Sequence, residues 1–262
     1  MKRTVFWIIS SLILLLFFAG CTGNPAKPAE PYRVLFIGDS TTSRNDIPGK
    51  FAKLAELGGH EVIVASSTKD YTSLATHTRL PQTTSKLEVD WDIVVLQENE
   101  AILLDPESRR DFSVPVIEQY IETVNNMGGV TLLYSSIGFR EGLSDFQLDD
   151  YEATQDAIDA AYVEIGNELN LPIAPVGEIW RRIYEADPDF DLWQLDGLHV
   201  SPEGAYLAAC VFYTVIYNQT PLDLPVSGEF VIDPAAIELI HQTVADVLSG
   251  NQDQYSLPLF GP

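Results

Sequence analysis

The chain has 262 residues, of which 46% are hydrophobic, so one large domain with a sizeable core is expected. Its 38 Asp and Glu residues outnumber its 15 Lys and Arg residues, and the formal net charge is −23. A surface of this sign repels polyanions, which excludes nucleic acids from the expected partners.

The first 20 residues have the pattern of a targeting segment rather than of a folded domain. Lys2 and Arg3 precede an apolar run over residues 5–19, and small residues lead to Cys21. This arrangement resembles a bacterial lipoprotein signal, which implies cleavage before Cys21 and acylation of that cysteine. Residues 21–31 are expected to form a tether. The protein is therefore expected in the bacterial cell envelope, outside the cytoplasm and lipid-anchored to a membrane; an uncleaved membrane anchor is the alternative.

Residues 32–250 alternate between short apolar segments and longer segments with helical spacing, which predicts one α/β domain. Strands are expected over residues 34–37, 61–65, 93–96, 130–134 and 172–174. Helices are expected over residues 46–57, 114–126, 151–169, 177–185, 202–217 and 234–248. The pattern predicts a doubly wound, flavodoxin-like parallel sheet of about five strands with helices on both faces, a three-layer α/β/α sandwich. Residues 251–262 are expected to be a loose C-terminal tail.

The first predicted strand runs directly into Gly38, Asp39 and Ser40. Ligands bind beyond the carboxyl ends of parallel strands, so a nucleophilic Ser40 would be well placed there. Gly38 permits a tight exit from the strand that a side chain would obstruct. The alternative is an ordinary turn or helix N-cap, braced by Asp39, which could also contact a substrate.

A nucleophilic serine needs a base, and His199 stands in the most distinctive setting of the four histidines. It follows Asp196 by three residues and precedes a helix with strong start signals. Ser201 is a good N-cap, and Pro202 suits the first helical position. A carboxylate this close can orient the ring of His199 and stabilise its protonated form.

These two segments resemble the SGNH (GDSL-type) hydrolases. In that family the Ser of an early G-D-S block and a late D-x-x-H block form the catalytic triad. Gly38-Asp39-Ser40 matches the first block, and Asp196-Gly-Leu-His199 matches the last. The resemblance implies a serine ester hydrolase in which Ser40 attacks, His199 is the base and Asp196 orients it. It also implies small acyl esters as substrates, often acetyl groups on sugars or cell-wall glycans.

The third block of the family, G-x-N-D, follows another strand and supplies an Asn whose side chain donates to the oxyanion. Residues 97–100 of this chain are Gln-Glu-Asn-Glu, so only Asn99 of that block is kept. The resemblance implies that Asn99 is an oxyanion donor. Gln97 competes for this role and is also a candidate substrate contact.

The second block normally supplies a Gly whose N–H also donates, but residues 66–77 contain no Gly. A bacterial subset with the pattern G-G-x-S-L-x-x-H aligns with residues 70–77, which places Asp70 and Tyr71 where the glycines would stand. Any residue except Pro carries a backbone N–H. The resemblance therefore implies oxyanion donors near Asp70 and Tyr71, beside the N–H of Ser40.

Two further residues are candidates for contact with a substrate. His77 is expected near the same sheet edge, where a substrate contact and a structural hydrogen bond are both open. Trp193 is a candidate pocket wall, because aromatic faces suit sugar rings. Cys210 is expected to be a buried thiol, which leaves no disulfide. The sequence has no glycine-rich phosphate loop and no clustered His and Cys, so neither a cofactor nor a metal is expected.

A non-catalytic envelope lipoprotein that binds a glycan in the same cleft is the second interpretation. The missing block glycines favour it, and Glu98 and Glu100 would add negative charge beside a developing oxyanion. Under either interpretation the expected partners are a small-molecule or glycan ester and a membrane, reached through Cys21. The oligomeric state stays open.

Overall fold

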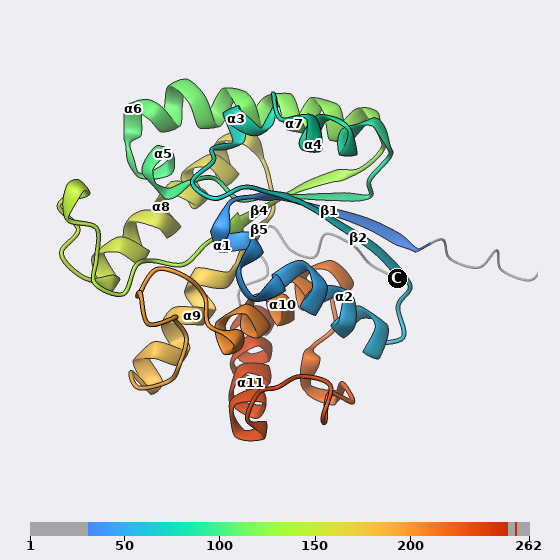
Figure 1. Cartoon of the computed structure of the whole chain (residues 1–262), viewed down its shortest axis with the longest axis vertical. Coiled ribbons are helices and arrows are strands. Elements are labelled where there is room, and N and C mark those ends of the chain that lie inside the picture. Colours follow the sequence, from blue (N-terminus) through green and yellow to red (C-terminus); the bar gives the residue numbers. More distant parts are fainter. Residues whose placement is uncertain (1–30, 251–254, 256–262) are drawn as a thin grey trace, which may run out of the picture. The chain divides into compact units, whose positions relative to one another are not determined.

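The computed structural model describes residues 31–250 and 255. The described residues form one sheet of five parallel strands, in the spatial order β2-β1-β3-β4-β5 (Figure 1). The strands are β1 (Tyr32–Gly38), β2 (Val62–Thr68), β3 (Ile93–Leu96), β4 (Val130–Ser135) and β5 (Ile173–Pro175). The predicted parallel sheet is confirmed, and the wholly apolar β3 lies in its centre.

Helices cover both faces of this sheet (Figure 1). The long ones are α2 (Ile47–Leu57), α7 (Val114–Asn126), α8 (Tyr151–Leu169), α9 (Val176–Ala186), α10 (Pro202–Tyr217) and α11 (Pro234–Gly250). Each coincides with a predicted helix to within one turn, because each carries a periodic apolar face or strong start and stop signals. At α10, for example, the Ser201 hydroxyl accepts the N–H of Gly204 at 2.9 Å, as an N-cap should.

Two hydrophobic cores lie on opposite faces of the sheet. Along β1, Val34 and Phe36 belong to one core and Leu35 and Ile37 to the other, because successive side chains of a strand point to opposite faces. The first core is completed by α2, α9, α10 and α11, and the second by α7 and α8. The predicted three-layer α/β/α sandwich is therefore confirmed. Cys210 on α10 is a buried free thiol, and burial raises its pKa.

Short helical turns fill the connections and were not predicted. They are α1 (Ser40–Ser43), α3 (Leu74–His77), α4 (Pro81–Thr84), α5 (Glu100–Leu104), α6 (Pro106–Ser108), a π-helical turn (Arg109–Ser113) and the 3₁₀ turns Arg44–Asp46, Lys86–Glu88, Ser144–Phe146 and Pro221–Asp223. Turns this short show no periodicity in sequence. Two of them, α1 and α5, begin directly at the carboxyl-end edge of the sheet and position the candidate site.

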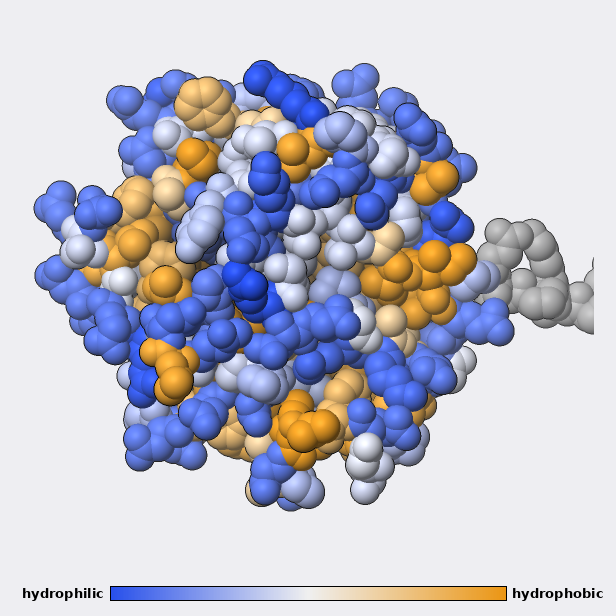
Figure 2. Space-filling view, in the orientation of Figure 1, coloured by the Kyte–Doolittle hydropathy of each residue, from blue (hydrophilic) through white to orange (hydrophobic). Residues whose placement is uncertain are grey.

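The visible surface is mostly hydrophilic, in keeping with the high net charge (Figure 2). One apolar area gathers around the yellow-green loop between β4 and α8. Within the part of the chain that the structure describes, no helix has the length and apolar character needed to span a membrane. Cys21 and the predicted targeting segment lie outside the described residues, so the lipid anchor stays a prediction.

The predicted loose tail includes one residue that is firmly packed. Tyr255 is buried in the core beside α7 and α8, and its carbonyl accepts the N–H of Ile173 at 3.1 Å. It thus occupies part of the outer edge of β5, the last strand of the sheet. At this residue the expectation of a loose tail is wrong, because the edge of β5 offers an N–H that the Tyr255 carbonyl accepts.

Candidate active site

Ser40 is the first residue of α1, directly beyond the end of β1. The turn needs Gly38, since a Cβ there would come within 2.5 Å of both Gln97 Oε1 and Thr42 Oγ1. Asp39 caps α1 by accepting the N–H of Thr41 at 2.9 Å. The chain therefore leaves the buried strand abruptly and presents Ser40 at the sheet edge, as expected.

Asp39 braces this turn through its neighbours as well. Its N–H donates to Gln97 Oε1 at 2.8 Å, and its Oδ2 accepts from Asn99 Nδ2 at 3.0 Å. The carboxylate is 2% exposed, yet it reaches the wall of a cavity beside Ser40. Asp39 thus joins the loop after β1 to the loop after β3, which fixes Ser40 relative to Asn99.

His199 and Asp196 form a hydrogen-bonded pair on the loop before α10. His199 Nδ1 lies 2.7 Å from Asp196 Oδ2, and Asp196 Oδ1 accepts the N–H groups of Leu198 and His199 at 2.9 and 3.0 Å. Gly197 makes the turn between them possible with a φ of +68°. Burial pushes the pKa of Asp196 upward, but the hydrogen bonds from His199 and from the two N–H groups outweigh it and lower the pKa to about 2. An ionised Asp196 holds a proton on Nδ1 of His199, which leaves Nε2 free to accept one.

A cavity of about 430 Å³ brings these elements together. Its wall includes Ser40, Asn99 and His199. The other lining residues are Asp39, Thr41, Tyr71, Glu100, Ala101, Phe139, Leu143, Asp145, Phe146 and Leu198. Among the described residues, no hydrogen bond joins Ser40 Oγ to His199 Nε2; such contacts are often long without substrate and tighten in the complex.

Asn99 is held with one amide hydrogen to spare. As the N-cap of α5 it accepts the N–H of Ala101 through Oδ1 at 3.2 Å, and its Nδ2 donates to Asp39. These two bonds fix which end of the amide is the donor. The second hydrogen on Nδ2 remains for a ligand in the cavity, which is the arrangement that an oxyanion donor requires.

The loop after β2 supports the alignment that placed Asp70 and Tyr71 at glycine positions. Tyr71 has a φ of +55°, in the left-handed region that favours glycine, and it lines the cavity. Asp70 instead pairs with Arg44 at 2.7 Å on the surface. Within the described part of the chain, no protein acceptor takes the N–H of Ser40, Asp70 or Tyr71. The N–H groups of Ser40 and Tyr71, two residues that line the cavity, are therefore free of protein acceptors.

Gln97 does not contact the cavity, so its prediction as a substrate contact is wrong. Its side chain is fully buried, and Oε1 accepts the N–H of Asp39 and, at 3.0 Å, the Thr42 hydroxyl. Its Nε2 donates to the carbonyl of Glu98 at 2.7 Å. The side chain fills the space left by Gly38 and holds the turn after β1.

His77 is likewise structural, and the substrate contact considered for it is wrong. The ring is fully buried, with Nε2 2.9 Å from the Gly38 carbonyl and Nδ1 2.9 Å from Thr83 Oγ1. Burial is the largest influence on its pKa and lowers it, which favours the neutral ring. A neutral His77 donates to Gly38 and accepts from Thr83, so it secures the end of β1.

Trp193 is not a pocket wall either, which corrects the third substrate-contact prediction. It is 5% exposed, and its Nε1 donates to the carbonyl of Gly138 at 3.0 Å. Its ring packs edge-on against Tyr151 and Trp180, with centroids 5.0 Å apart in both cases. Trp193 thereby ties the loop that carries Asp196 and His199 to the loop after β4.

That loop after β4, residues 136–150, supplies an apolar cavity wall that was not predicted from the sequence. Phe139, Leu143 and Phe146 line the cavity from it. The Arg140 N–H donates to the carbonyl of Gly197 at 2.9 Å, which joins the wall to the loop of His199. Loop side chains carry no periodic signal; the pair of aromatics near two glycines was the only available indication.

Glu98 and Glu100 are both buried beside the site. Glu98 Oε1 accepts the N–H groups of Leu74 and Asn99, and its Oε2 accepts from Ser113 at 2.9 Å. Burial raises the pKa of Glu98, and that of Glu100 well above its usual range. A raised pKa favours the uncharged form and so reduces the negative charge that these carboxyls were expected to add. No group of three or more His, Cys, Asp or Glu within the described residues could hold a metal ion.

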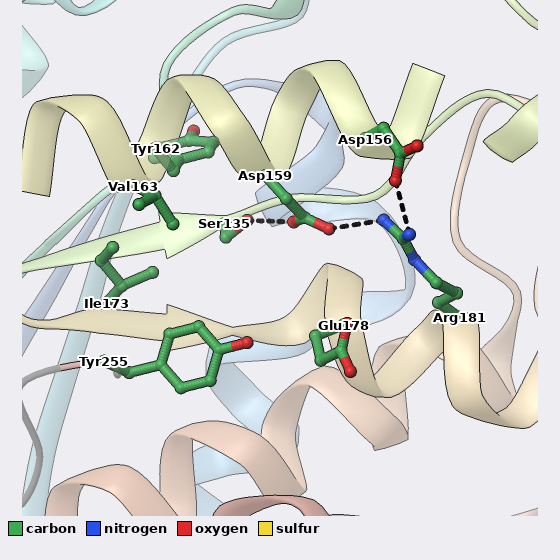
Figure 3. Close-up of a pocket in the computed structure, with 9 residues that line it drawn as sticks. All are labelled: Ser135, Asp156, Asp159, Tyr162, Val163, Ile173, Glu178, Arg181 and Tyr255. Carbon is green, nitrogen blue, oxygen red and sulfur yellow. Dashed lines mark hydrogen bonds and ion pairs between the residues drawn. The ribbon is translucent and has the colours of Figure 1, made fainter. Parts of the chain in front are cut away.

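A second cavity, of about 270 Å³, lies between α8 and α9 (Figure 3). Asp159 crosses it, accepting from Ser135 Oγ at 2.8 Å and from Arg181 Nη2 at 2.9 Å. Gln155 donates to the same carboxylate at 3.0 Å and accepts the N–H of Gly138 at 2.7 Å. This network anchors the start of the loop that walls the candidate site.

Stability should depend on pH through Asp159. Burial raises its pKa to about 6, against roughly 3.9 in an unfolded chain. The folded state therefore binds the proton more tightly, so the contribution of Asp159 to the free energy of unfolding falls as pH rises from about 4 to about 6. Denaturant unfolding of wild type and Asp159→Asn should give a difference that declines over this window by on the order of 2 kcal/mol.

A second variant checks the sign of this effect. Ser135→Ala removes a donor to the Asp159 carboxylate, so the upper end of the window should move to higher pH. If Arg181 instead dominated and lowered the pKa of Asp159, the difference between wild type and Asp159→Asn would stay flat from about pH 4 to about pH 6 and would fall only as pH drops below about 4.

Neither a protein-family model nor a curated protein matches the sequence. Solved structures do. A DUF4886 family protein from Bacteroides uniformis has a TM-score of 0.73 at 16% identity, over 84% of this chain and 95% of that one. A protein from Slackia heliotrinireducens assigned as an SGNH hydrolase has a TM-score of 0.57 at 24% identity, over 70% and 97% of the two chains. An acetyl xylan esterase, AlAXEase, has a TM-score of 0.52 at 15% identity, over 70% and 98%.

These likenesses establish the fold. The chain has the three-layer α/β/α architecture of the SGNH hydrolases, as the sequence blocks indicated.

Proposed function

We propose that this chain, with its SGNH-hydrolase fold, is a serine ester hydrolase. One observation carries the proposal: a single cavity is lined by Ser40, His199 and Asn99, while an ionised Asp196 holds the other nitrogen of His199. A nucleophile, a base, a group that orients the base and an oxyanion donor are thus assembled from three segments, those after β1 and β3 and the loop before α10.

The proposed reaction is acyl transfer through Ser40. Its Oγ attacks the ester carbonyl while His199 Nε2 takes the hydroxyl proton. The oxyanion is stabilised by the N–H of Ser40, the free hydrogen on Asn99 Nδ2 and a backbone N–H at Tyr71 or Asp70. The intermediate collapses, the C–O bond to the alcohol breaks, and His199 returns the proton to the leaving oxygen. Water then hydrolyses the acyl group from Ser40 by the same steps.

We further propose small acyl esters as substrates, with acetyl esters of glycans among them. The apolar wall of Phe139, Leu143 and Phe146 can cover an acyl group or the face of a sugar ring. The similarity to an acetyl xylan esterase supports this choice of substrate class. The motif that ends at Cys21 supports a lipid-anchored protein of the bacterial envelope, where glycan esters occur.

Labelling by a fluorophosphonate probe tests the mechanism without knowledge of the substrate. The Ser40 oxygen displaces fluoride from phosphorus only if a base activates it, so wild type should carry the label on Ser40 and His199→Ala should not. Mass spectrometry of the labelled peptide identifies the residue. In parallel, wild type should hydrolyse p-nitrophenyl acetate. A folded protein that binds an acetylated glycan but shows neither reaction would be the non-catalytic glycan binder.

A further inference from the structure

Glu100 is a buried carboxyl at the cavity. It is the first residue of α5, is 5% exposed and lines the same cavity as Ser40. Its Oε1 accepts from Ser136 Oγ at 3.1 Å and from Thr41 Oγ1 at 3.4 Å. No donor from another described residue reaches Oε2, and Oε2 is not among the unpaired side-chain atoms that are sealed from solvent. The carboxyl also interacts with the backbone N–H of Glu100 itself, and Oε2 is the oxygen of this cavity-lining side chain that no donor of another described residue takes.

The surroundings of this carboxyl disfavour a negative charge. Burial is the main cause that raises its pKa, and the Asp39 carboxylate on the neighbouring turn raises it further. Tyr134 of β4 and Tyr162 of α8 also face it, and burial raises the pKa of both phenols, so they stay neutral. His199 lines the same cavity, and no Lys or Arg is among the described residues that line it.

We propose that Glu100 is a substrate-binding residue whose protonated Oε2 donates a hydrogen bond to an uncharged oxygen of the group held in the cavity. The proposal rests on the proposed ester hydrolysis and names its substrate class, esters of neutral sugars or similar neutral alcohols. Three carboxyl side chains, those of Asp39, Glu100 and Asp145, line the cavity, and no described Lys or Arg lines it that could balance an anionic ligand. Esters of uronates and other acidic sugars are therefore excluded.

The same wall explains why the ligand should be partly apolar. Phe139 and Phe146, on the loop after β4, line the cavity with aromatic side chains. An uncharged sugar ring can pack against them. A neutral sugar offers an apolar face to the aromatics and several acceptor oxygens to Glu100. Its hydroxyls need a partner in such a site, since an unpaired buried acceptor costs about 1–3 kcal/mol.

Binding is best measured where turnover is removed. In a Ser40→Ala background, calorimetry would compare an acetylated methyl glucoside with the matching acetylated methyl glucuronide, from about pH 5 to about pH 9. The glucoside should bind at least about tenfold more tightly than the glucuronide. Its dissociation constant should rise about three- to tenfold as pH passes through the pKa of Glu100, because the ionised carboxyl loses its proton donor.

Two second-site variants isolate the contribution of Glu100 from that of the other groups around the cavity. Glu100→Gln keeps a neutral donor at the cavity and can still accept from Ser136 and Thr41. Because the Gln side chain does not ionise, the three- to tenfold rise of the dissociation constant with pH should disappear in this variant. Glu98→Gln makes the same chemical change outside the cavity and should keep that rise. Equal binding of the two sugars, or a rise that persists in Glu100→Gln, overturns the proposal. Failure of ester hydrolysis itself would appear separately, as absent p-nitrophenyl acetate turnover and absent labelling in the protein with Ser40 intact.

Discussion

Ser40→Ala is expected to lower kcat/KM for p-nitrophenyl acetate by about 10⁵-fold or more, to the level left by binding and the oxyanion donors alone. The variant removes the only atom that forms the acyl bond in the proposed reaction. It should not unfold the protein, because Ser40 Oγ makes no hydrogen bond to any described residue and Asp39 remains as the cap of α1. Steady-state kinetics and thermal unfolding of purified wild type and variant give the two numbers.

Ser43→Ala is the matched control. Ser43 ends the same short helix, α1, and does not line the cavity. It should keep wild-type kinetics and wild-type labelling by the fluorophosphonate. Retention of full activity in Ser40→Ala with an unchanged melting temperature would place the nucleophile elsewhere and refute the proposed mechanism.

The sheet and the long helices could be predicted because apolar residues recur along them in regular patterns and capping residues mark their ends. Ile93–Leu96 is apolar throughout and can only be a buried strand at the centre of a parallel sheet. Helix α10 (Pro202–Tyr217) has Ser201 as its N-cap and Pro202 as its first residue, as predicted. Such signals do not depend on distant parts of the chain, so one sequence suffices to detect them.

Side chains at the ends of strands were harder to assign. Gln97, like Asn99, follows β3, but Gln97 turns into the protein and Asn99 toward the cavity. The position of a residue at the carboxyl end of a strand therefore predicts that it lies near the site, but it does not predict the direction of its side chain. The same holds for His77. Like Gln97, it is fully buried and holds the turn that presents Ser40. The residues wrongly expected to touch a substrate are the support for the residue that is proposed to attack it.

The cavity wall depends on tertiary contacts that leave no local trace. Residues 136–150 hold their place through Gln155 on α8 and through Trp193 and Gly197 on the loop before α10, two other parts of the chain. No sequence pattern within the loop predicts these hydrogen bonds. The chemical character of the pocket, and with it the role proposed for Glu100, could for this reason be inferred only from the structure.

Asp196→Asn is expected to lower kcat/KM by about 10³–10⁴-fold while leaving the loop in place. The Asn oxygen can still accept the N–H groups of Leu198 and His199, which Asp196 Oδ1 now accepts at 2.9 and 3.0 Å. The amide nitrogen would then face His199 Nδ1, where Asp196 Oδ2 lies at 2.7 Å. Because an amide nitrogen donates, Nδ1 must accept, and the ring proton moves to Nε2. A ring protonated at Nε2 cannot take the proton of Ser40.

Asp191→Asn is the control for the loss of one charge on this loop. Asp191 is exposed, and among the described residues its only hydrogen bond from a side chain is the one that its backbone carbonyl accepts from Ser201 Oγ at 2.6 Å. It should therefore keep wild-type kinetics. The decisive comparison is the rate of fluorophosphonate labelling, which requires an activated Ser40 but no substrate recognition: it should fall with kcat/KM in Asp196→Asn and stay unchanged in Asp191→Asn. If labelling of Asp196→Asn matched wild type, the carboxylate would not be what sets the tautomer of His199, and the Ser40–His199–Asp196 mechanism would lose its third member.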